Sequence, residues 1–580
     1  MTDHPRGEPD EMTNDEISVV FRNIGNLIQI KDDETFRARI YDRAADAIEA
    51  LSVDLHQLAE EGKLRSIPSV GKTIEQKIIE MLETGQCHFY DELLRKIGAE
   101  VLDLLAIRSV GVKTAGRFYR ELGVRSLGDL RAAIDTGQLK KMKRMGARSI
   151  ATIDEGLCFV EAQRQMRPLG QILPIAHTVS DALKNYPAIK RLDFTGELRR
   201  REEVLQSLDL IVECVDSEAL AEMLSEIDGV AGVTAENELQ FVASVDAGFP
   251  LHVYGFSAEE YEAALLTTTG ADAHLARLSQ IAAAQELEGI RDALPAWLTN
   301  KAESEIYDKL GLPFIVPELR GDADSIEAAL ADNLPTLIGQ GDLRSDLHMH
   351  TNWSDGRASI REMVEVAKRL GHEYIAITDH SQSSRVASGL TPERLLEQIQ
   401  QIREIGVEID GIEVLAGSEV DILRDGSLDF PDEILAQLDI VIASVHANFS
   451  LSETEMTGRV IRAIENPFVT IIGHPTGRLL GRRPGYAIDL DGVINAAAAN
   501  RVALEINASP SRLDLEPSAV RKARECGALL SINTDAHAIP QLEHGVFGIN
   551  VARRGWLKQT DVLNTYPLRT LKELISLRKE

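Results

Sequence analysis

Histidines and carboxylates that could bind metal ions recur through the C-terminal 240 or so residues of the chain, beginning with the segment SDLHMHTNWSDG. His348 and His350 are one residue apart, and Asp355 follows five residues later. Alternate side chains of a β-strand point to the same face, so this pair would aim two imidazoles at one point. Imidazoles beside a carboxylate commonly bind Zn²⁺, Mn²⁺ or Fe. Taken alone, the pair fits surface histidines at a strand end equally well.

The same arrangement repeats downstream. Short runs rich in Ile and Val occupy residues 374–377, 412–416, 440–445, 469–472, 502–506 and 529–532, and nearly all end at a residue of a metal-binding type. The candidate ligands are His348, His350, Asp355, His380, Glu419, His446, His474, Asp535 and His537. Nine N and O donors exceed the needs of one ion, so we expect two or three divalent ions, with Glu419 as the bridging ligand. No Cys is among them, which argues against a thiolate structural site.

The elements between these runs explain how the ligands could meet. Helical patterns at residues 360–370, 392–405 and 517–526 alternate with the apolar runs. Such strand–helix repeats predict a parallel sheet, and seven of them approach a closed barrel. Barrels of this kind carry their catalytic residues at the carboxyl ends of the strands, where the candidate ligands fall.

This order of motifs resembles the PHP (polymerase and histidinol phosphatase) domain. The phrases LHMHTNWSDG, ITDHS, ASVHANF, GHPTGR and INTDAHA are similar to those of the PHP domain of bacterial family-X DNA polymerases. The resemblance implies a distorted (β/α)₇ barrel that holds up to three metal ions and hydrolyses phosphoesters. It implies Mn²⁺ or Zn²⁺ as cofactors, with Fe as a third candidate, and catalytic roles for Glu419 and Asp535. Three arginines in the loop after His474, namely Arg478, Arg482 and Arg483, could clamp a substrate phosphate, with a solvated basic loop as the alternative.

Composition limits the remaining possibilities. The 580 residues suggest three to five domains, and a formal net charge of −30 would repel DNA unless local patches, helix N-termini or bound metals provide the contact. No apolar run approaches the roughly 20 residues of a membrane span, and the N-terminus does not resemble a signal peptide. Four scattered cysteines fit a reducing compartment. We expect a cytoplasmic, nucleoid-associated monomer without membrane contact.

Local DNA-binding elements are predicted in the N-terminal part. Apolar-glycine turns recur at residues 66–74, 107–115 and, less clearly, 142–148. Such turns leave backbone N–H groups at a helix N-terminus free to hold a phosphate, and these copies resemble helix-hairpin-helix elements. The predicted DNA contacts are Gly71, Lys72, Gly111, Lys113, Lys143 and Arg144. Simple connections between helices are the alternative.

Residues 14–71 look like the small N-terminal domain of family-X polymerases. In relatives with 5′-deoxyribose-phosphate lyase activity, a lysine in the helix after the first hairpin forms a Schiff base. Lys77 is the nearest match here, with a simple phosphate contact as the alternative.

The polymerase palm, expected at residues 171–260, departs from the family pattern G-S-x-R-R-x-x-E-x-x-x-D-x-D. The frame aligns without a gap from Gly196 to Asp209, and Arg199 and Arg200 match. The phosphate-binding serine is replaced by Glu197, the first metal carboxylate by Ser207, and the third by His252, leaving only Asp209. Because two Mg²⁺ ions need several oxygen ligands, we expect Mg²⁺ binding and nucleotidyl transfer to be lost.

The expected organisation is multidomain α+β and α/β. The predicted parts are a disordered tail at 1–12, an 8-kDa-like helical domain at 13–90, a fingers-like helix-hairpin-helix domain at 91–170, the palm at 171–260, a thumb at 261–325, a linker at 326–342 and the PHP domain at 343–580.

Together, the motifs favour a DNA repair protein whose barrel is a metal-dependent 3′→5′ exonuclease acting on gapped, nicked or 3′-ended DNA. Abasic-site endonuclease or 3′-phosphatase activity would use the same site. The alternatives are a gap-filling polymerase using Glu202, Glu203 or Asp209, a small-molecule phosphoesterase of the histidinol-phosphatase type, and a non-catalytic DNA-end scaffold.

Overall fold

The computed structural model describes residues 12, 14–49, 51, 55–60, 62–107, 109–143, 145–237, 239–246, 248–290 and 295–579. The predicted tail at 1–12 lies outside this set apart from Met12, as does Arg144. The chain forms two compact units: residues up to Gln165 with the short segments Ser383–Gly389 and His446–Leu451, and the rest of the chain. Within the described ranges, no helix is long and apolar enough to cross a membrane.

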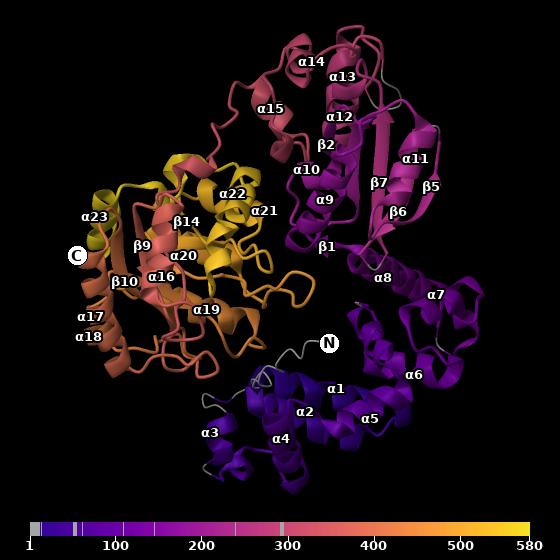
Figure 1. Ribbon diagram of the computed structural model, residues 1–580. Helices are drawn as coiled ribbons and strands as arrows, with labels where there is room; N and C mark the ends of the chain where they lie inside the picture. The colour runs from indigo at the N-terminus through magenta and orange to yellow at the C-terminus, as the bar shows by residue number, and fades with distance from the viewer. Residues whose placement is uncertain are drawn as a thin grey trace, which may run out of the picture. The chain divides into compact units, whose positions relative to one another are not determined.

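The first unit is built from helices (Figure 1). Their order is α1 (Asn14–Asp32), α2 (Thr35–Glu49), α3 (Leu55–Glu60), η1 (Leu64–Ser66), α4 (Lys72–Thr84), α5 (His88–Ile97), η2 (Ala99–Ala106), α6 (Val112–Leu122), α7 (Leu127–Asp135), η3 (Leu139–Lys141) and α8 (Ala147–Gln165). The first helix buries one apolar face, with Ile17, Phe21 and Ile24 in one core. Gly71 and Gly111 stand immediately before α4 and α6, which are the helices expected after the two glycine turns.

The part of the second unit predicted to be the palm contains a five-stranded sheet. Its spatial order is β2 (Leu192–Phe194), β4 (Leu208–Glu213), β7 (Phe249–Phe256), β6 (Gln240–Val245) and β5 (Ala231–Ala235). Only β4 and β7 pair in parallel. A two-strand ribbon, β1 (Arg167–Pro168) with β3 (Val204–Leu205), and the helices α9 (Leu169–Lys184), α10 (Gly196–Arg199) and α11 (Ser217–Glu226) complete it.

A helical segment follows the palm. It comprises α12 (Tyr261–Thr269), α13 (Asp272–Ala284), α14 (Glu303–Lys309), η4 (Pro317–Leu319), α15 (Asp324–Leu330) and η5 (Gln340–Asp342). Glu303 ties this segment to the palm, because Arg199 donates to its carboxylate at 3.0 and 2.6 Å and the buried Arg320 donates from the other side.

The C-terminal part is the predicted barrel of alternating parallel strands and helices (Figure 1). Its strands, adjacent in chain order, are β8 (Ser345–Asp346), β9 (Tyr374–Ile377), β10 (Glu413–Asp421), β11 (Ile440–Ser444), β12 (Ile471–Ile472), β13 (Ala503–Asn507) and β14 (Leu530–Asn533). The helices are α16 (Ile360–Arg369), α17 (Pro392–Glu408), α18 (Asp432–Leu435), α19 (Glu453–Ile464), α20 (Leu490–Asn500), α21 (Pro517–Glu525), α22 (Gly545–Arg554) and α23 (Leu568–Lys579). The predicted multidomain fold class is thus confirmed.

Six of the seven barrel strands overlap a predicted apolar run, because strands covered on both faces need continuous apolar sequence. The first strand, β8, was not among those runs. The largest difference is β10, which continues past residue 416 to Asp421 and pairs with β11 from Gly417 to Asp421. Glu419 therefore lies inside a strand rather than beyond its end. The sequence could not indicate this, because buried polar residues end an apolar pattern even when the strand continues.

The barrel is held together where its first and last strands meet. Near the carboxyl ends, His350 N donates to Ala536 O (2.8 Å) and Asp535 N donates to His348 O (3.0 Å). At the other end, the buried Asn564 side chain spans both strands: its amide nitrogen donates to Ser345 O (2.8 Å) and Ile532 O (2.6 Å), and its oxygen accepts from Ile532 N (3.0 Å). We call this junction between the first strand, β8, and the last strand, β14, the seam of the barrel. Backbone hydrogen bonds close the seam at one end, and the Asn564 side chain closes it at the other.

Replacing Asn564 by leucine should weaken this seam. Three buried backbone groups would lose their partner, so we expect the free energy of unfolding of the barrel to fall by about 2–4 kcal/mol. Asn500→Leu is a matched control, because the Asn500 amide contacts one carbonyl of its own helix. Denaturant unfolding would measure both, and equal midpoints for the two variants would contradict a closing role.

Candidate metal centre and DNA-binding elements

The first two candidate ligands enter the site directly after β8. The structure ends this strand at Asp346, so His348 and His350 stand in an extended segment beyond it, rather than on the strand as expected. The bridge of Met349 to Ala536 keeps the segment extended. Both imidazoles are buried on the same side, with ring centroids 5.2 Å apart. The two rings therefore converge as predicted, but the cause is the pairing of this segment with the chain after the last strand of the barrel.

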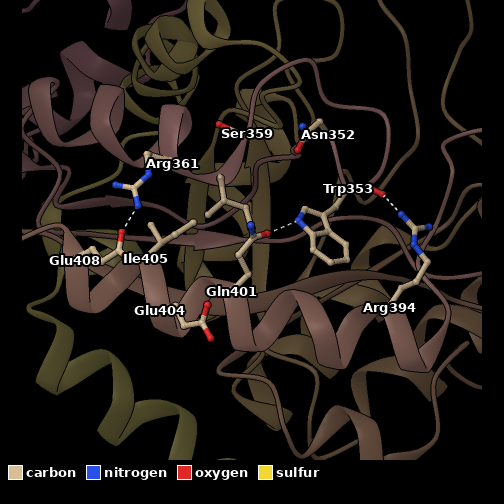
Figure 2. Close-up of a pocket in the computed structure, with 10 residues that line it drawn as sticks. Asn352, Trp353, Ser359, Arg361, Arg394, Gln401, Glu404, Ile405 and Glu408 are labelled. Atoms are coloured by element: carbon tan, nitrogen blue, oxygen red, sulfur yellow. Dashed lines mark hydrogen bonds and ion pairs between the residues drawn. The ribbon is translucent and has the colours of Figure 1, made fainter.

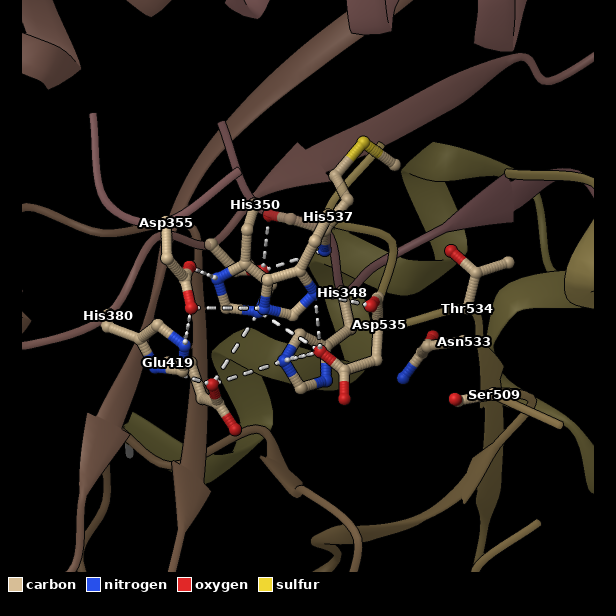
Figure 3. Close-up of polar contacts among 12 residues, drawn as sticks. His348, His350, Asp355, His380, Glu419, Ser509, Asn533, Thr534, Asp535 and His537 are labelled. Carbon is tan, nitrogen blue, oxygen red and sulfur yellow. Dashed lines mark hydrogen bonds and ion pairs between the residues drawn. The ribbon is translucent and has the colours of Figure 1, made fainter. Parts of the chain in front are cut away.

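One group of donors gathers around Asp355. Its Oδ2 lies 3.4 Å from His537 Nε2 and 3.6 Å from His380 Nε2. The His350 ring stacks between the other two imidazoles, with centroid distances of 4.3 Å to His380 and 4.2 Å to His537. The potential ligand atoms of these four residues lie within 4.8 Å of one another (Figure 3).

A second group shares His350 with the first. Asp535 Oδ1 lies 3.1 Å from His350 Nε2 and 3.6 Å from His348 Nε2. The backbone of Asp535 has a φ of +54° and that of His474 a φ of +26°, both unusual for residues with a side chain. Such strain commonly persists where a side chain has to be aimed at one point.

Glu419 lies at the centre of the cluster. Its Oε2 is 2.9 Å from His380 Nδ1, 3.5 Å from His348 Nε2 and 3.6 Å from His350 Nε2. Its Oε1 is 3.0 Å from His474 Nε2. A carboxylate that faces four imidazoles has the position needed to bridge ions. His446 follows β11 by two residues and belongs to the first compact unit, so its role as a ligand stays a prediction.

The charges and orphaned atoms of the cluster fit divalent cations. Burial favours a neutral Asp535, but His348, His350 and His537 outweigh it and hold the pKa of this carboxyl well below its usual range. Burial and the neighbouring His537 and His380 lower the pKa of His350 to about 3, leaving the neutral form that binds metal. Within the described parts of the chain, the buried His348 Nε2 and His350 Nδ1 have no hydrogen-bond partner. The donor set is therefore compatible with divalent metal ions.

Glu505 holds the cluster from behind, and sequence analysis missed it. This fully buried carboxylate lies 2.7 Å from His348 Nδ1 and accepts from the backbone N of His474 at 2.7 Å. Asn507 and Asn533 donate to it as well. A carboxylate behind a ligating imidazole fixes its tautomer and orientation. In the sequence, the feature that could have indicated this role is a single acidic residue, Glu505, inside the apolar run 502–506.

Asp379 positions the loop that carries Asp355. It accepts from Thr351 N (2.8 Å), Thr351 Oγ1 (2.7 Å) and the Gln398 amide (2.5 Å). Within this loop, a Cβ at Gly356 would stand 2.5 Å from His350 O, so only glycine allows the close return of the chain. Asp379 belongs to the phrase ITDHS, one of those that carry the family resemblance, yet its positioning role could not be read from the sequence.

A pocket of about 600 Å³ flanks the same loop between α16 and α17 (Figure 2). Trp353 forms part of its wall, two residues before Asp355. The indole Nε1 donates to Gln401 (2.7 Å), and Arg394 donates to the Trp353 carbonyl (2.5 Å). The indole is therefore held in one orientation, two residues along the chain from Asp355.

Arg478 does not point a free guanidinium into the cluster. It donates to Arg512 O (3.1 Å), to Glu516 (3.3 Å) and to Glu203 of the palm (2.5 Å). The predicted phosphate clamp at Arg478 is therefore replaced by a structural role. Arg512 is the cation beside the cluster, with Nε 3.6 Å from Asp535 Oδ2, and it was not singled out from the sequence.

The palm positions form a hydrogen-bonded cluster of their own. Ser207 Oγ donates to Asp209 (2.9 Å), and His252 Nδ1 lies 2.8 Å from Asp209 Oδ1. The hydrogen bond with Asp209 raises the pKa of His252. Among the described residues, the groups of three or more metal-binding side chains lie outside the palm.

The palm's matched arginines also have internal partners. Arg199 pairs with Glu303, and Arg200 donates to Thr269 O (2.7 Å). Glu197 accepts from the Gln206 backbone N (2.7 Å) and side-chain amide (2.9 Å). These contacts occupy groups at the positions where the family pattern would bind a triphosphate.

The glycines of the two clearer predicted hairpins lie in the first compact unit. Gly71 and Gly111 have φ values of −90° and −85°, which any residue adopts, and a Cβ at either position would meet nothing within 4 Å. The fold itself therefore does not require glycine there. Lys72, Lys113 and Lys143 are exposed nearby in the sequence, whereas Arg144 lies outside the described residues.

Lys77 lies on α4 and is half-buried. Its ammonium stands 4.2 Å from the centroid of the Phe89 ring, a cation–π contact. A role in Schiff-base chemistry stays a prediction.

Comparison with known proteins decides the family. The chain is 34% identical over 567 residues to the protein named DNA polymerase/3′-5′ exonuclease PolX of Bacillus subtilis (strain 168), covering 96% of this chain and 98% of the relative. The chain belongs to the PolX family. This confirms the predicted resemblance to family-X polymerases with a PHP domain.

Family models mark the modules of this PolX homologue. A PHP domain matches residues 346–509, a helix-hairpin-helix domain 12–87, a SAM-like helix-hairpin-helix tandem 101–157, and the DNA polymerase beta thumb 264–321. The PHP part is also 33% identical over 246 residues to a probable phosphatase of Thermoanaerobacter sp. (strain X514), covering 40% of this chain and 95% of the relative. A probable phosphatase of Shewanella piezotolerans is 37% identical over 202 residues, covering 33% of this chain and 77% of that protein. The chain thus combines a PHP domain of a hydrolytic family with modules that bind DNA.

Replacing Glu505 by glutamine should reduce metal affinity about 10–100-fold, because the amide cannot accept from all the groups that hold His348 and His474 in place. Titration of the metal-free protein with Mn²⁺ would measure it. Glu413→Gln, at the exposed start of β10, is the control. Unchanged affinity for the Glu505 variant would remove its supporting role.

Proposed function

We propose that the PHP barrel hydrolyses DNA phosphodiesters from the 3′ end, as a metal-dependent 3′→5′ exonuclease. The observation that carries the proposal is the cluster in which two donor groups share His350 while Glu419 faces four imidazoles. The name of the Bacillus subtilis relative, which includes 3′-5′ exonuclease, supports it. Abasic-site endonuclease and 3′-phosphatase activities are finer variants of the same proposal.

The residues that would hold two or three ions are the nine candidate ligands, with Glu419 as the bridge. When bound, Mn²⁺, Zn²⁺ or Fe would activate water and neutralise charge on the phosphate. The chain's own part is to keep the carboxylates ionised, His350 neutral, and His348 fixed against Glu505. Asp379 and Gly356 keep the Asp355 loop folded over the site.

Nucleic acid is favoured over a small phosphomonoester as the substrate by two features. The immobilised Trp353 indole, two residues from Asp355, offers a face on which a base can stack. The helix-hairpin-helix modules would hold the backbone of gapped, nicked or 3′-ended DNA, since Gly71 and Gly111 leave space for a phosphate at a helix N-terminus. The phosphatase-type alternative draws on relatives that match only the PHP part.

The palm is proposed to have lost nucleotidyl transfer while keeping its fold. Asp209 is engaged by Ser207 and His252, and Glu197 adds negative charge where a triphosphate would bind. The opposing hypothesis is an active gap-filling polymerase. It is supported by the words DNA polymerase in the name of the Bacillus subtilis relative.

Several expectations from the sequence stay proposals. These are the division into domains at 13–90, 91–170, 171–260, 261–325, 326–342 and 343–580, a monomeric state, and a cytoplasmic, nucleoid-associated location.

The exonuclease is tested with a His348→Ala/His350→Ala variant. Removing both imidazoles should lower 3′→5′ degradation of a labelled DNA strand by more than about 10³-fold, because bound ions supply several kcal/mol of the rate enhancement. Metal content should fall with it. His88→Ala, an exposed histidine on α5, is the control. Degradation by the double variant at the unmodified rate would refute the assignment.

The palm is tested in the same double-histidine background, where an exonuclease cannot mask slow synthesis. We expect no primer extension with Mg²⁺ or Mn²⁺, since a hydroxyl and an imidazole bring no negative charge to a hard cation. NMR titration should give His252 a pKa above its usual value, unchanged by Mg²⁺, and Asp209→Asn should lower it. Extension that Asp209→Ala abolishes would show an active palm.

A further inference from the structure

Arg512 has an unsatisfied guanidinium beside the metal cluster. Its Nε stands 3.6 Å from Asp535 Oδ2, which is too long for a hydrogen bond. Its Nη1 is buried and, among the residues that the structure describes, has no hydrogen-bond partner. A buried guanidinium nitrogen without a partner is unfavourable unless an anion completes the site. Arginine matches the geometry of a phosphate group.

The loop that carries Arg512 is held by Arg478. The Arg478 Nε donates to Arg512 O (3.1 Å), and its Nη2 donates to Leu513 O. Nη1 contacts Glu516 at 3.3 Å. A single side chain therefore holds this loop at Arg512, Leu513 and Glu516.

Arg478 is in turn held by the palm. Its Nη2 donates to Glu203 Oε1 at 2.5 Å, and the two side chains are only 14% and 13% exposed. The backbones approach closely around this pair, because a Cβ at Gly170 would stand 2.2 Å from Pro510 Cβ. Glu203 occupies the glutamate position of the palm pattern, immediately before β3.

We propose that Arg512 binds the phosphate of the DNA at the metal centre, and that Glu203 is a positioning residue that acts on it through Arg478. The proposal rests on the proposed nuclease function. It gives the palm a role in hydrolysis: one palm carboxylate orients an arginine that, in turn, holds the substrate-binding loop of the barrel.

A neighbouring ion pair offers a matched control. Glu202 also reaches from the palm to the barrel, pairing with Arg554, and it contacts Arg200 within the palm. Arg554 lies on α22 rather than in the Arg512 loop. Glu202→Ala therefore breaks a comparable contact without touching the loop.

The experiment compares full-length Glu203→Ala, Glu202→Ala, Arg512→Ala and Glu203→Ala/Arg512→Ala with the unmodified chain. It measures kcat/KM for 3′-end degradation and, in Mn²⁺, the Kd for inorganic phosphate by calorimetry. Thermal unfolding of each variant is recorded alongside. We expect Arg512→Ala to weaken both properties about tenfold or more, as loss of a charge-assisted hydrogen bond does.

Glu203→Ala should produce most of that loss, whereas Glu202→Ala should not. The double variant should lose no more than Arg512→Ala alone, because Glu203 and Arg512 act through the same contact with phosphate. Multiplied losses in the double variant, or equal behaviour of Glu203→Ala and Glu202→Ala, would overturn the positioning role. Phosphate binding by Arg512→Ala equal to the unmodified chain would overturn the phosphate contact. Absence of DNA degradation by the unmodified chain would refute the nuclease, while the phosphate measurement would still decide this proposal.

Discussion

A parallel sheet of seven strands brings its first and last strands together only if it curls into a barrel, and the candidate metal centre depends on that closure. His348 and His350 stand on one side of the seam, and Asp535 and His537 on the other. The backbone bonds that join the two sides run through the same residues, from His350 N to Ala536 O and from Asp535 N to His348 O. The same backbone hydrogen bonds therefore close the barrel and position the candidate ligands. A cation between the two sides would strengthen the seam, and the seam in turn fixes the ligands.

Much of this arrangement could be predicted from the sequence because its cause is local. Buried parallel strands need continuous apolar runs, and their carboxyl ends must carry the polar residues of a site. The runs at 374–377 and 529–532 agree with β9 and β14 to within one residue. Family motifs then supplied the order of the ligands, so the membership in PolX followed from the same residues.

The parts that escaped prediction depend on partners far away in the chain. Glu505, Asn564 and Arg512 are each a single polar residue whose importance comes from what faces it after folding. Arg478 was placed in the wrong role because a basic loop next to a phosphodiester site suggests a clamp, whereas a palm glutamate 275 residues away had already engaged it. Sequence patterns report burial and periodicity well, but they do not report which buried charge meets which.

In the predicted palm, the residues at the expected ligand positions pair with one another. Its sheet keeps the β4–β7 parallel pair, with Asp209 directly opposite His252. Arg199 joins Glu303, and Arg320 completes a buried charge network with the thumb segment. An arginine that matches the family pattern thus stabilises a contact between elements. The same part of the chain contacts the barrel through Glu202 and Glu203.

The seam also determines when, during protein synthesis, the centre can exist. His350 and Asp535 are separated by 185 residues, and the amide that closes the far end of the seam belongs to Asn564, close to the last helix of the chain. Domains fold in the order in which they leave the ribosome. A nascent chain would consequently carry its folded helix-hairpin-helix modules long before it could assemble the metal centre. Any hydrolytic activity of this site is thereby confined to molecules whose translation is essentially complete.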